Sequence, residues 1–526
     1  MNIKVKKMPK TAPVEIEVKE NITIEELVRM VREELPYPVL GALVDNEFVH
    51  MYHKLSVPCY VELLDMRNYT VNQMYQNSLT MIYLKAISDV LGAEAAEKTE
   101  IQNSINKGFY TIIRRNTSVT EKEVEQVQAR MHDIVEQNLP FEEDEDGQYI
   151  LDDYKTMMCG KVLPSTKYVK LFELRKYRRG VLLRFPHQKN PNVIPEFTDE
   201  VKLYEAFGEA NNWGNLMEVS YVSDLNEKVK NGQYKELIQL SEALHEKKIA
   251  DLAELIKKER RRVVLIAGPS SSGKTTFANR LLIQMKVIGL KPIYLGTDDY
   301  FVERKDAPLD EFGEKNFEDL EAVDVGLFNA QMKALLAGEV VDIPTFDFMA
   351  GEKKFGRRFT KIGKDQPIII EGIHALNEDL TSLIPEEDKF KIYISPLTAL
   401  NIDAHNRIST TDARMLRRMV RDNQFRGYSA KATIESWPKV RAGEDKNIFP
   451  YSNEADALFN SVHLYELSVL KKYAEPLLME IGKDEPEYTE AQRMLGFLKY
   501  FEVIEDDSSI ANNSILREFI GGSILV

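Results

Sequence analysis

A loop rich in glycine and serine near the middle of the chain has the residue types that bind phosphate. Gly268 and Gly273 bound the loop, and Lys274 and Thr275 follow it. Glycine allows backbone angles and close approaches that a Cβ would forbid, so successive N–H groups can face one phosphate. The lysine adds a full positive charge, and the threonine hydroxyl can ligate Mg²⁺. We therefore predict that ATP and Mg²⁺ bind at Gly268, Ser270, Ser271, Ser272, Gly273, Lys274, Thr275 and Thr276.

The segments on either side of this loop have the form that a phosphate-binding loop requires. Residues 263–266 are apolar and mostly β-branched, as in a short buried strand, and helical spacing resumes from residue 274. A helix starting there adds its positive end to the same place. A chance glycine-serine turn before a helix is the alternative, but it does not account for strand, loop and helix in register.

Carboxylates follow two further predicted strands. Asp298 and Asp299 come directly after the strand 293–295, and Glu371 follows the apolar strand 368–370. Acidic residues at the carboxyl ends of parallel strands lie where ligands bind in open α/β sheets. We expect Asp298 to orient or deprotonate an acceptor hydroxyl, and Glu371 to hold Mg²⁺ together with the loop threonine. Asp299 is interpreted as a surface turn residue.

Four arginines recur at helical spacing in the last third of the chain: Arg414, Arg417, Arg418 and Arg421. They share one face of the predicted helix, where their charges would repel one another. Arginine's planar fork suits phosphate, so a lid over the triphosphate explains them better than a solvated face. Arg426, beside Gly427, is a further candidate for this lid.

The composition is that of a multidomain globular protein. The chain has 526 residues, a formal net charge of −15 and 43% hydrophobic residues, which predicts two to four domains. The acidic charge argues against a surface that coats nucleic acid generally. Cys59 and Cys159 have no metal-ligand spacing, and no apolar run approaches membrane-spanning length. We expect a reduced, cytoplasmic protein without a membrane partner.

Residues 1–62 are predicted to form a small α/β unit. Residues 14–18 alternate as in a half-buried strand, and Thr23 with Glu26 forms a capping box before a helix over 24–34. Residues 42–44 resume an extended pattern. The arrangement resembles a TGS domain, the small ubiquitin-like module at the front of threonyl-tRNA synthetases.

Residues 63–225 extend that resemblance. Helical spacing over 71–91 and 118–135 precedes a segment around Cys159 that looks like the cysteine-containing part of the synthetase editing domain. That family uses a His-x-x-x-His helix and a cysteine with a nearby histidine. No histidine lies between His53 and His132, so the chemistry does not carry over. We interpret Cys159 as an inert core residue, and the region as an inactive α+β module that binds a tRNA end or a partner protein.

A connecting helix is predicted over residues 226–262, ending in the basic run 257–262. A nucleic-acid patch is one interpretation of this run. A solvated helix end is favoured, because basic side chains suit the negative end of a helix and short runs are common there.

From residue 263 onward, short apolar strands, including one at 392–394, alternate with helical stretches, which predicts a parallel sheet covered by helices. Six ordered motifs over about 263–465 resemble the uridine kinase/phosphoribulokinase family. They are Gly-x-x-x-x-Gly-Lys-Thr at 268–275, Thr-Asp-Asp-Tyr-Phe at 297–301, Asn-Phe-Glu at 316–318, Ile-Pro-Thr-Phe-Asp-Phe at 343–348, Ile-Glu-Gly-Ile at 370–373 and Arg-Arg-Met-Val-Arg-Asp at 417–422. The whole chain is similar to bacterial nucleoside kinases fused to a synthetase-like front end.

The resemblance implies roles for further residues. Phe317, Phe346 and Phe348 match aromatic positions of the nucleoside pocket, although plain core packing explains each of them equally well. Glu318 stands where the family has an aspartate that grips ribose hydroxyls, and Arg418 and Arg421 act on the phosphates, Arg418 also touching substrate.

Three positions depart from the uridine kinase pattern. Gly351, Tyr428 and Ser436 replace a histidine, an arginine and a glutamine that read a pyrimidine base. A pocket lacking these groups loses its discrimination between bases. The reaction type therefore carries over, whereas uridine itself does not follow.

These observations predict a multidomain α/β protein whose five segments are a TGS-like domain (1–62), an inactive editing-like domain (63–225), a connecting helix (226–262), a P-loop nucleoside kinase (263–475) and a C-terminal extension (476–526). The predicted reaction is ATP- and Mg²⁺-dependent phosphoryl transfer to the 5′-hydroxyl of a ribonucleoside. The alternatives are a kinase of a non-nucleoside alcohol and a tRNA-associated P-loop ATPase regulator. The presence of Asp298 separates them, because a switch ATPase needs a group that positions water and no alcohol pocket.

Overall fold

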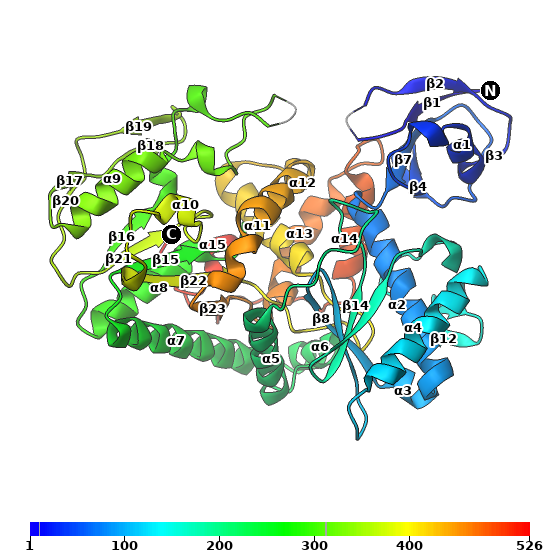
Figure 1. The fold of residues 1–526 in the computed structure, drawn as a ribbon, viewed down its shortest axis with the longest axis horizontal. Coiled ribbons are helices and arrows are strands. Elements are labelled where there is room, and N and C mark those ends of the chain that lie inside the picture. The colour runs from blue at the N-terminus through cyan, green and yellow to red at the C-terminus, as the bar shows by residue number, and fades with distance from the viewer. Residues whose placement is uncertain (10, 311–312) are drawn as a thin grey trace.

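The computed structural model describes residues 1–9, 11–310 and 313–526. Figure 1 shows a parallel sheet with its helices at one end of the molecule and two smaller α/β bodies at the other. Helices α11 to α14 lie between them. Within the described residues, no helix has the length and hydropathy to cross a membrane.

The central sheet carries the predicted phosphate-binding loop. Its strands run in the order β16-β21-β15-β22-β23, and every neighbouring pair is parallel. The four strands predicted from the sequence are present, and the fifth, β23, was not predicted. Their bounds are β15 Val263–Ala267, β16 Ile293–Gly296, β21 Ile368–Glu371, β22 Lys389–Ser395 and β23 Ala457–Asn460.

Both faces of this sheet are buried, because successive side chains of each strand point to opposite sides. Val264 and Ile266 of β15 enter one core, which also contains residues of α7, α8, α11 and α13. Val263 and Leu265 enter a second core with residues of α9. The helices are α7 Tyr234–Glu259, α8 Lys274–Val287, α9 Val325–Leu336, α10 Glu378–Thr381, α11 Thr410–Arg426, α12 Ala430–Asn447 and α13 Glu466–Met479.

A peripheral part of the kinase region consists of short antiparallel pairs. Strand β17 pairs with β20, and β18 pairs with β19. They cover β17 Val341–Asp342, β18 Thr345–Asp347, β19 Glu352–Lys354 and β20 Phe359–Thr360.

The N-terminal body is a five-stranded mixed sheet in the order β2-β1-β7-β4-β5, packed against α1. The predicted capping box is confirmed, since Thr23 and Glu26 bond reciprocally at the start of α1. The helix ends at Met30 and a 3-10 turn covers Arg32–Glu34. The elements are β1 Asn2–Lys6, β2 Val14–Glu17, β3 Ile22–Thr23, α1 Ile24–Met30, β4 Val39–Val44, β5 Glu47–Val49, β6 Lys54–Leu55 and β7 Tyr60–Asp65.

The middle body is a four-stranded antiparallel sheet, β13-β14-β9-β8, whose core is shared with α2 and α4. Both of these helices were predicted. The elements are α2 Tyr69–Leu91, α3 Ala93–Glu97, β8 Thr99–Ile105, β9 Gly108–Ile113, α4 Glu121–Glu136, β10 Glu142–Glu143, β11 Tyr149–Leu151, β12 Tyr154–Thr156, β13 Glu173–Tyr177, β14 Gly180–Arg184 and α5 Val201–Leu216.

The single connecting helix expected over 226–262 is two helices, α6 Val222–Lys230 and α7. Gly232 separates them with a φ of +74°, an angle that glycine adopts at little cost. Helix α7 is also more than a link, because Ile249 and Ile256 are buried in the core beneath the sheet. The basic run lies at its end, where Arg261 Nη1 donates to the carbonyl of Glu387 at 2.9 Å.

The C-terminal segment returns to the kinase sheet. Helix α13 continues past residue 475, then α14 (Tyr488–Leu498) and α15 (Arg517–Ile520) follow. Ile515 and Phe519 join the core that contains α8. The C-terminus lies beside α8, where Asn279 Nδ2 donates to the carbonyl of Leu525 at 3.4 Å.

Candidate active site

The loop between β15 and α8 needs glycine at both of its ends. A Cβ on Gly268 would collide with the carbonyl oxygen of Ile394 on the neighbouring strand. Gly273 has a φ of +86° and is the N-cap of α8, and a Cβ there would collide with Ile515. The sequence therefore places a tight turn directly before a helix N-terminus, which is where anions bind.

The peptide groups of this loop are held from outside. Arg414 donates to the carbonyl of Ser270 at 3.2 Å and Arg417 to that of Ser271 at 3.3 Å. The hydroxyl of Ser461 donates to the carbonyl of Ser272 at 2.6 Å. In a trans peptide group the N–H points opposite to the C=O. The N–H groups paired with these carbonyls therefore face the inside of the loop.

The predicted role of Arg414 and Arg417 in a lid is wrong. Both side chains are buried, with exposed fractions of 1% and 0%. Arg414 pairs with Glu444, and Arg417 pairs with Glu466 at 2.6 Å. A buried guanidinium requires such a partner, because its desolvation is otherwise too costly. These two arginines instead support the loop by donating to the carbonyls of Ser270 and Ser271. Because both are buried, the alternative that they form a solvated helix face is wrong as well.

Arg418 and Arg421 lie on the same helix and remain partly accessible. Arg418 Nη1 donates to Ser270 Oγ at 2.8 Å, so it reaches the loop itself. Both arginines also contact Asp422, at 3.3 Å and 2.7 Å. The expected pair is thus placed beside the phosphate-binding loop, with one carboxylate shared between them.

Lys274 lies among three carboxyl groups. Its Nζ donates to the carbonyl of Gly268 at 3.1 Å, so the side chain folds back over the loop. Burial raises the pKa of Asp298, Glu318 and Glu371, and the charge of Lys274 opposes the increase at each of them. One ammonium group therefore acts on residues from three separate segments, which the fold brings to one edge of the sheet.

Glu371 ends β21 next to the loop. Its Oε2 accepts hydrogen bonds from Tyr294 Oη at 2.9 Å and from Thr275 Oγ1 at 3.4 Å. Burial raises its pKa to about 7, and Asp298 adds to the increase. A cation at this position would favour the charged carboxylate.

The two oxygens predicted to hold magnesium, on Thr275 and Glu371, are therefore adjacent. Within the described ranges, no cluster of three or more His, Cys, Asp or Glu side chains could hold a metal alone. Mg²⁺ is commonly bound by one or two protein oxygens together with substrate phosphates and water. The donor set fits a magnesium ion that arrives with a nucleotide.

Asp298 follows β16 in a 3-10 turn, Thr297–Tyr300. Its side chain is exposed, although protein surrounds the carboxyl closely enough for desolvation to be the main cause of its raised pKa. Asp299 and Glu318 add to that increase. A carboxyl that is accessible and more basic than usual suits a group that accepts a proton from an alcohol.

Asp299 is more than the surface turn residue expected. It forms an ion pair with Arg358 at 2.9 Å. Since its charge is neutralised by this partner, Asp299 positions the turn that presents Asp298.

The predicted aromatic positions form one cluster around Phe301. The ring of Phe301 lies 6.1 Å from Phe317, 5.8 Å from Phe346 and 6.3 Å from Phe348. Phe346 belongs to the core under β15, whereas Phe348 is 57% exposed. The cluster therefore runs from the core to the surface, next to the turn that carries Asp298.

Three carboxylates at this site were not predicted. Glu444 accepts from the backbone N–H of Ser270 at 2.9 Å. Glu518, from the C-terminal segment, accepts from the N–H and the hydroxyl of Thr276 at 3.2 Å and 2.7 Å. Glu466, the partner of Arg417, is the third. All three come from distant parts of the chain, so no local pattern signals them.

The expectation that Cys159 is inert agrees with its surroundings. Burial raises the pKa of its thiol to about 12, so the nucleophilic thiolate is not formed near neutral pH. The residue lies in the middle body, away from the loop.

Comparisons with known proteins agree on the kinase region. Residues 263–468 match the phosphoribulokinase/uridine kinase family. A uridine kinase of Staphylococcus aureus is 30% identical over 197 residues, which cover 37% of this chain and 86% of that enzyme. Among solved structures, a candidate fructose transport system kinase from Silicibacter sp. TM1040 is 19% identical, with a TM-score of 0.28, over 40% of this chain and 98% of that chain. A candidate uridine kinase from Bacillus stearothermophilus is 24% identical, with a TM-score of 0.22, over 25% and 70%.

Proposed function

The chain belongs to the phosphoribulokinase/uridine kinase family through residues 263–468, and from this premise we propose that it transfers a phosphoryl group from ATP, with Mg²⁺, to the 5′-hydroxyl of a ribonucleoside. The observation that supports the proposal most strongly is the position of Lys274. Its charge acts on Asp298, Glu371 and Glu318, which are the groups assigned to the acceptor, the metal and the ribose.

Each residue has a distinct part in this reaction. Residues 268–276 bind the phosphates through those N–H groups that face the inside of the loop, together with the ammonium of Lys274. Mg²⁺ bound with the nucleotide would neutralise phosphate charge. Thr275 and Glu371 provide the oxygens that hold it. Arg418 and Arg421 stabilise the charge that develops on the transferred group.

Asp298 accepts the proton of the attacking hydroxyl. The proton moves to its carboxyl as the oxygen–phosphorus bond forms, and the charge of Lys274 favours the carboxylate form against the effect of burial. Proton transfer to a positioned group contributes about 10²- to 10⁴-fold to a rate.

The acceptor is proposed to lie between Glu318 and the aromatic cluster. The carboxylate of Glu318 would accept from the ribose hydroxyls, and Phe317, Phe346 and Phe348 would contact the sugar and base. The proposal does not extend to uridine, because Gly351, Tyr428 and Ser436 provide none of the pyrimidine-reading side chains. Gly351 also packs against Arg304, so no side chain fits there without displacing it.

The N-terminal half is proposed to be a TGS-like domain (1–62) followed by an inactive editing-like domain (63–225), with the kinase at 263–475 and an extension at 476–526. The mixed sheet with one helix in the first body and the protonated Cys159 in the second support this assignment. A tRNA end or a partner protein is the proposed ligand of this half.

ADP release from the intact chain tests the function. The assay compares ATP and Mg²⁺ alone with the same mixture plus single ribonucleosides, non-nucleoside primary alcohols or tRNA. Stimulation by a ribonucleoside, and its absence with the matching 5′-deoxynucleoside, supports the proposal. Stimulation only by another alcohol, or only by tRNA, would replace it with a different kinase or with a P-loop regulator.

A further inference from the structure

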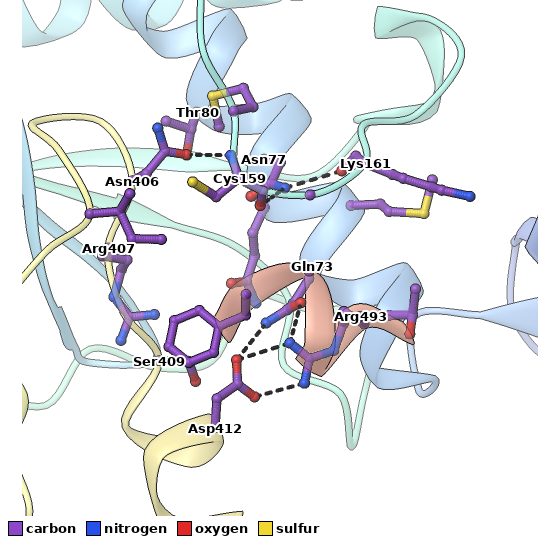
Figure 2. Close-up of a pocket in the computed structure, with 18 of the residues that line it drawn as sticks. Gln73, Asn77, Thr80, Cys159, Lys161, Asn406, Arg407, Ser409, Asp412 and Arg493 are labelled. Atoms are coloured by element: carbon purple, nitrogen blue, oxygen red, sulfur yellow. Dashed lines mark hydrogen bonds and ion pairs between the residues drawn. The ribbon is translucent and has the colours of Figure 1, made fainter. Parts of the chain in front are cut away.

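A cavity of about 500 Å³ lies outside the phosphate-binding loop, where four parts of the chain meet. Figure 2 shows Gln73 and Asn77 of α2, Cys159 and Lys161 of the middle body, and Arg407 and Asp412 of the kinase region around it. Arg493 of α14 completes the wall. Its volume lies within the range of small-molecule sites. No residue assigned to phosphoryl transfer lines it.

Arg407 in this wall has a buried hydrogen-bond donor without an acceptor. Its Nε is buried and makes no hydrogen bond, and no carboxylate of the described residues lies within ion-pair distance of its guanidinium. The guanidinium lies 5.0 Å from the centre of the Phe109 ring, which holds it in place. A buried donor without an acceptor is costly, so this arginine is suited to bind an anion that enters the cavity.

The nearest acid does not fill this role, because it is already bound. Asp412 accepts from Arg493 at 2.8 Å and from Tyr69 Oη at 2.9 Å. Gln73 adds a contact to the same carboxylate at 3.4 Å. Arg493 also pairs with Glu490 at 2.6 Å, so Asp412 shares its arginine with a second carboxylate, and it acts on Arg407 only from beyond ion-pair distance. The Nε donor of Arg407 is left for a ligand.

Two more charged side chains line the cavity: Glu47, which pairs with Lys483 at 2.7 Å, and Lys161, which lies 5.1 Å from the centre of the Phe48 ring. Much of the remaining lining is neutral and suits a flat organic group. Side-chain amides and aromatic rings alternate around the cavity, and they are Gln76, Asn77, Gln492, Phe109, Tyr488, Phe497 and Tyr500. Burial keeps the Cys159 thiol protonated, so the site is equipped to bind and not to form a covalent bond.

We propose that this cavity binds a small organic oxyanion, a phosphate or carboxylate carried on an aromatic ring, with Arg407 as its anchor. The site is separate from the proposed nucleotide site. It goes beyond the proposed function, since neither the nucleotide nor the acceptor occupies it.

The cavity is coupled to the phosphate-binding loop through α11. Ser409 is the N-cap of this helix, and Asp412 in its first turn is fixed by Arg493 from the cavity wall. Two turns later, Arg417 and Arg418 hold the loop itself. A ligand that shifts the start of α11 therefore changes the geometry around the phosphates, and this regulatory consequence rests on the proposed kinase function.

A second cavity, of about 270 Å³, continues toward the loop. It shares five lining residues with the first, Gln73, Gln76, Phe109, Arg407 and Ser409, and it reaches Pro269 and Arg414. Arg407 thus lines both the proposed ligand cavity and the second cavity, which extends to the phosphate-binding loop.

Binding is tested on the intact chain by calorimetric titration with phenyl phosphate, benzoate and neutral benzamide. We expect phenyl phosphate or benzoate to bind with a Kd on the order of millimolar, as for fragments of this size, and benzamide not to bind. Which of the two anions binds identifies the oxyanion as phosphate or carboxylate. Binding of benzamide equal to that of both anions, or binding of none of the three, overturns the proposal.

Variants then locate the site. Arg407→Gln should weaken anion binding by about 10- to 100-fold, the effect of losing a charge-assisted hydrogen bond. Arg175→Gln is the matched control, because Arg175 also stacks on a phenylalanine, Phe197, but does not line the cavity. Lys274→Ala should leave anion binding unchanged. Loss of binding in Lys274→Ala together with its retention in Arg407→Gln would place the anion at the phosphate-binding loop and overturn the proposal.

If Arg407→Gln does not fold, Arg407→Lys keeps the positive charge and removes the planar fork, and it should still weaken binding about tenfold. The titration measures anion binding without any kinase assay. A failure to bind the anion can therefore be distinguished from a failure of the proposed kinase function. The regulatory step is read separately, as a change in the rate of ADP release when the bound anion is added to the wild-type chain and no change in Arg407→Gln.

Discussion

Glu371 makes proton release on magnesium–nucleotide binding a quantitative test of the site. Burial raises the pKa of this carboxyl from 4.5 to about 7 in the protein without a metal. Mg²⁺ binds the charged carboxylate, so its arrival with the nucleotide should drive the proton off. Because the raised pKa keeps the group partly protonated up to about pH 7, the number of protons released must fall as the pH rises.

The size of the effect follows from the protonated fraction of a group with a pKa of about 7. Binding of a preformed complex of Mg²⁺ and a non-hydrolysable ATP analogue should release about 0.9 proton at pH 6, about 0.5 at pH 7 and about 0.1 at pH 8. Titration calorimetry in two buffers with different ionisation enthalpies measures this number directly.

Glu371→Gln is the control, because its amide cannot titrate and its carbonyl oxygen can still accept from Tyr294. The pH-dependent release should disappear in this variant, while any proton exchange from the nucleotide remains. Release that is independent of pH in the wild type, or that persists unchanged in Glu371→Gln, would refute the assignment of Glu371 as the metal-facing carboxylate.

Three further substitutions test the groups around the loop. Glu518→Ala frees the N–H of Thr276 for phosphate, so nucleotide affinity should rise about tenfold in a fluorescence titration. An unchanged or weaker affinity would count against a phosphate contact at this N–H. Arg417→Met leaves Glu466 buried without its ion-pair partner and should cost about 3–5 kcal/mol of stability, seen as a lower unfolding midpoint. Arg418→Gln should lower kcat by about 10²- to 10³-fold with little change in that midpoint. A larger loss of stability in Arg418→Gln than in Arg417→Met would reverse the two assignments.

The parts of the fold that sequence patterns predicted correctly are those determined by residues close together in the chain. Four strands of the central sheet are apolar runs bounded by turn residues, and the capping box at Thr23 is a reciprocal pair three residues apart. Strand β23, Ala457–Asn460, is as long as β16 but contains no β-branched residue, so the pattern did not mark it. The loop glycines were predictable because each is required by a close backbone approach or a positive φ.

The errors come from contacts between distant segments. Helical periodicity correctly placed Arg414 and Arg417 with Arg418, but it carries no information on Glu444 and Glu466, which neutralise the first two. The contact of Glu518 with the loop joins residues more than 240 positions apart. The cavity around Arg407 is likewise assembled from four parts of the chain, so only the folded structure reveals it.

The most direct test of the central claim is a single-turnover measurement with ATP labelled in the γ-phosphoryl group, using wild-type chain and Asp298→Asn with a ribonucleoside that stimulates ADP release. We predict that label appears on the 5′-oxygen in the wild type, and that Asp298→Asn transfers it about 10²- to 10⁴-fold more slowly while binding ATP with unchanged affinity. Transfer at the wild-type rate in Asp298→Asn, or label found only in inorganic phosphate, would contradict the account.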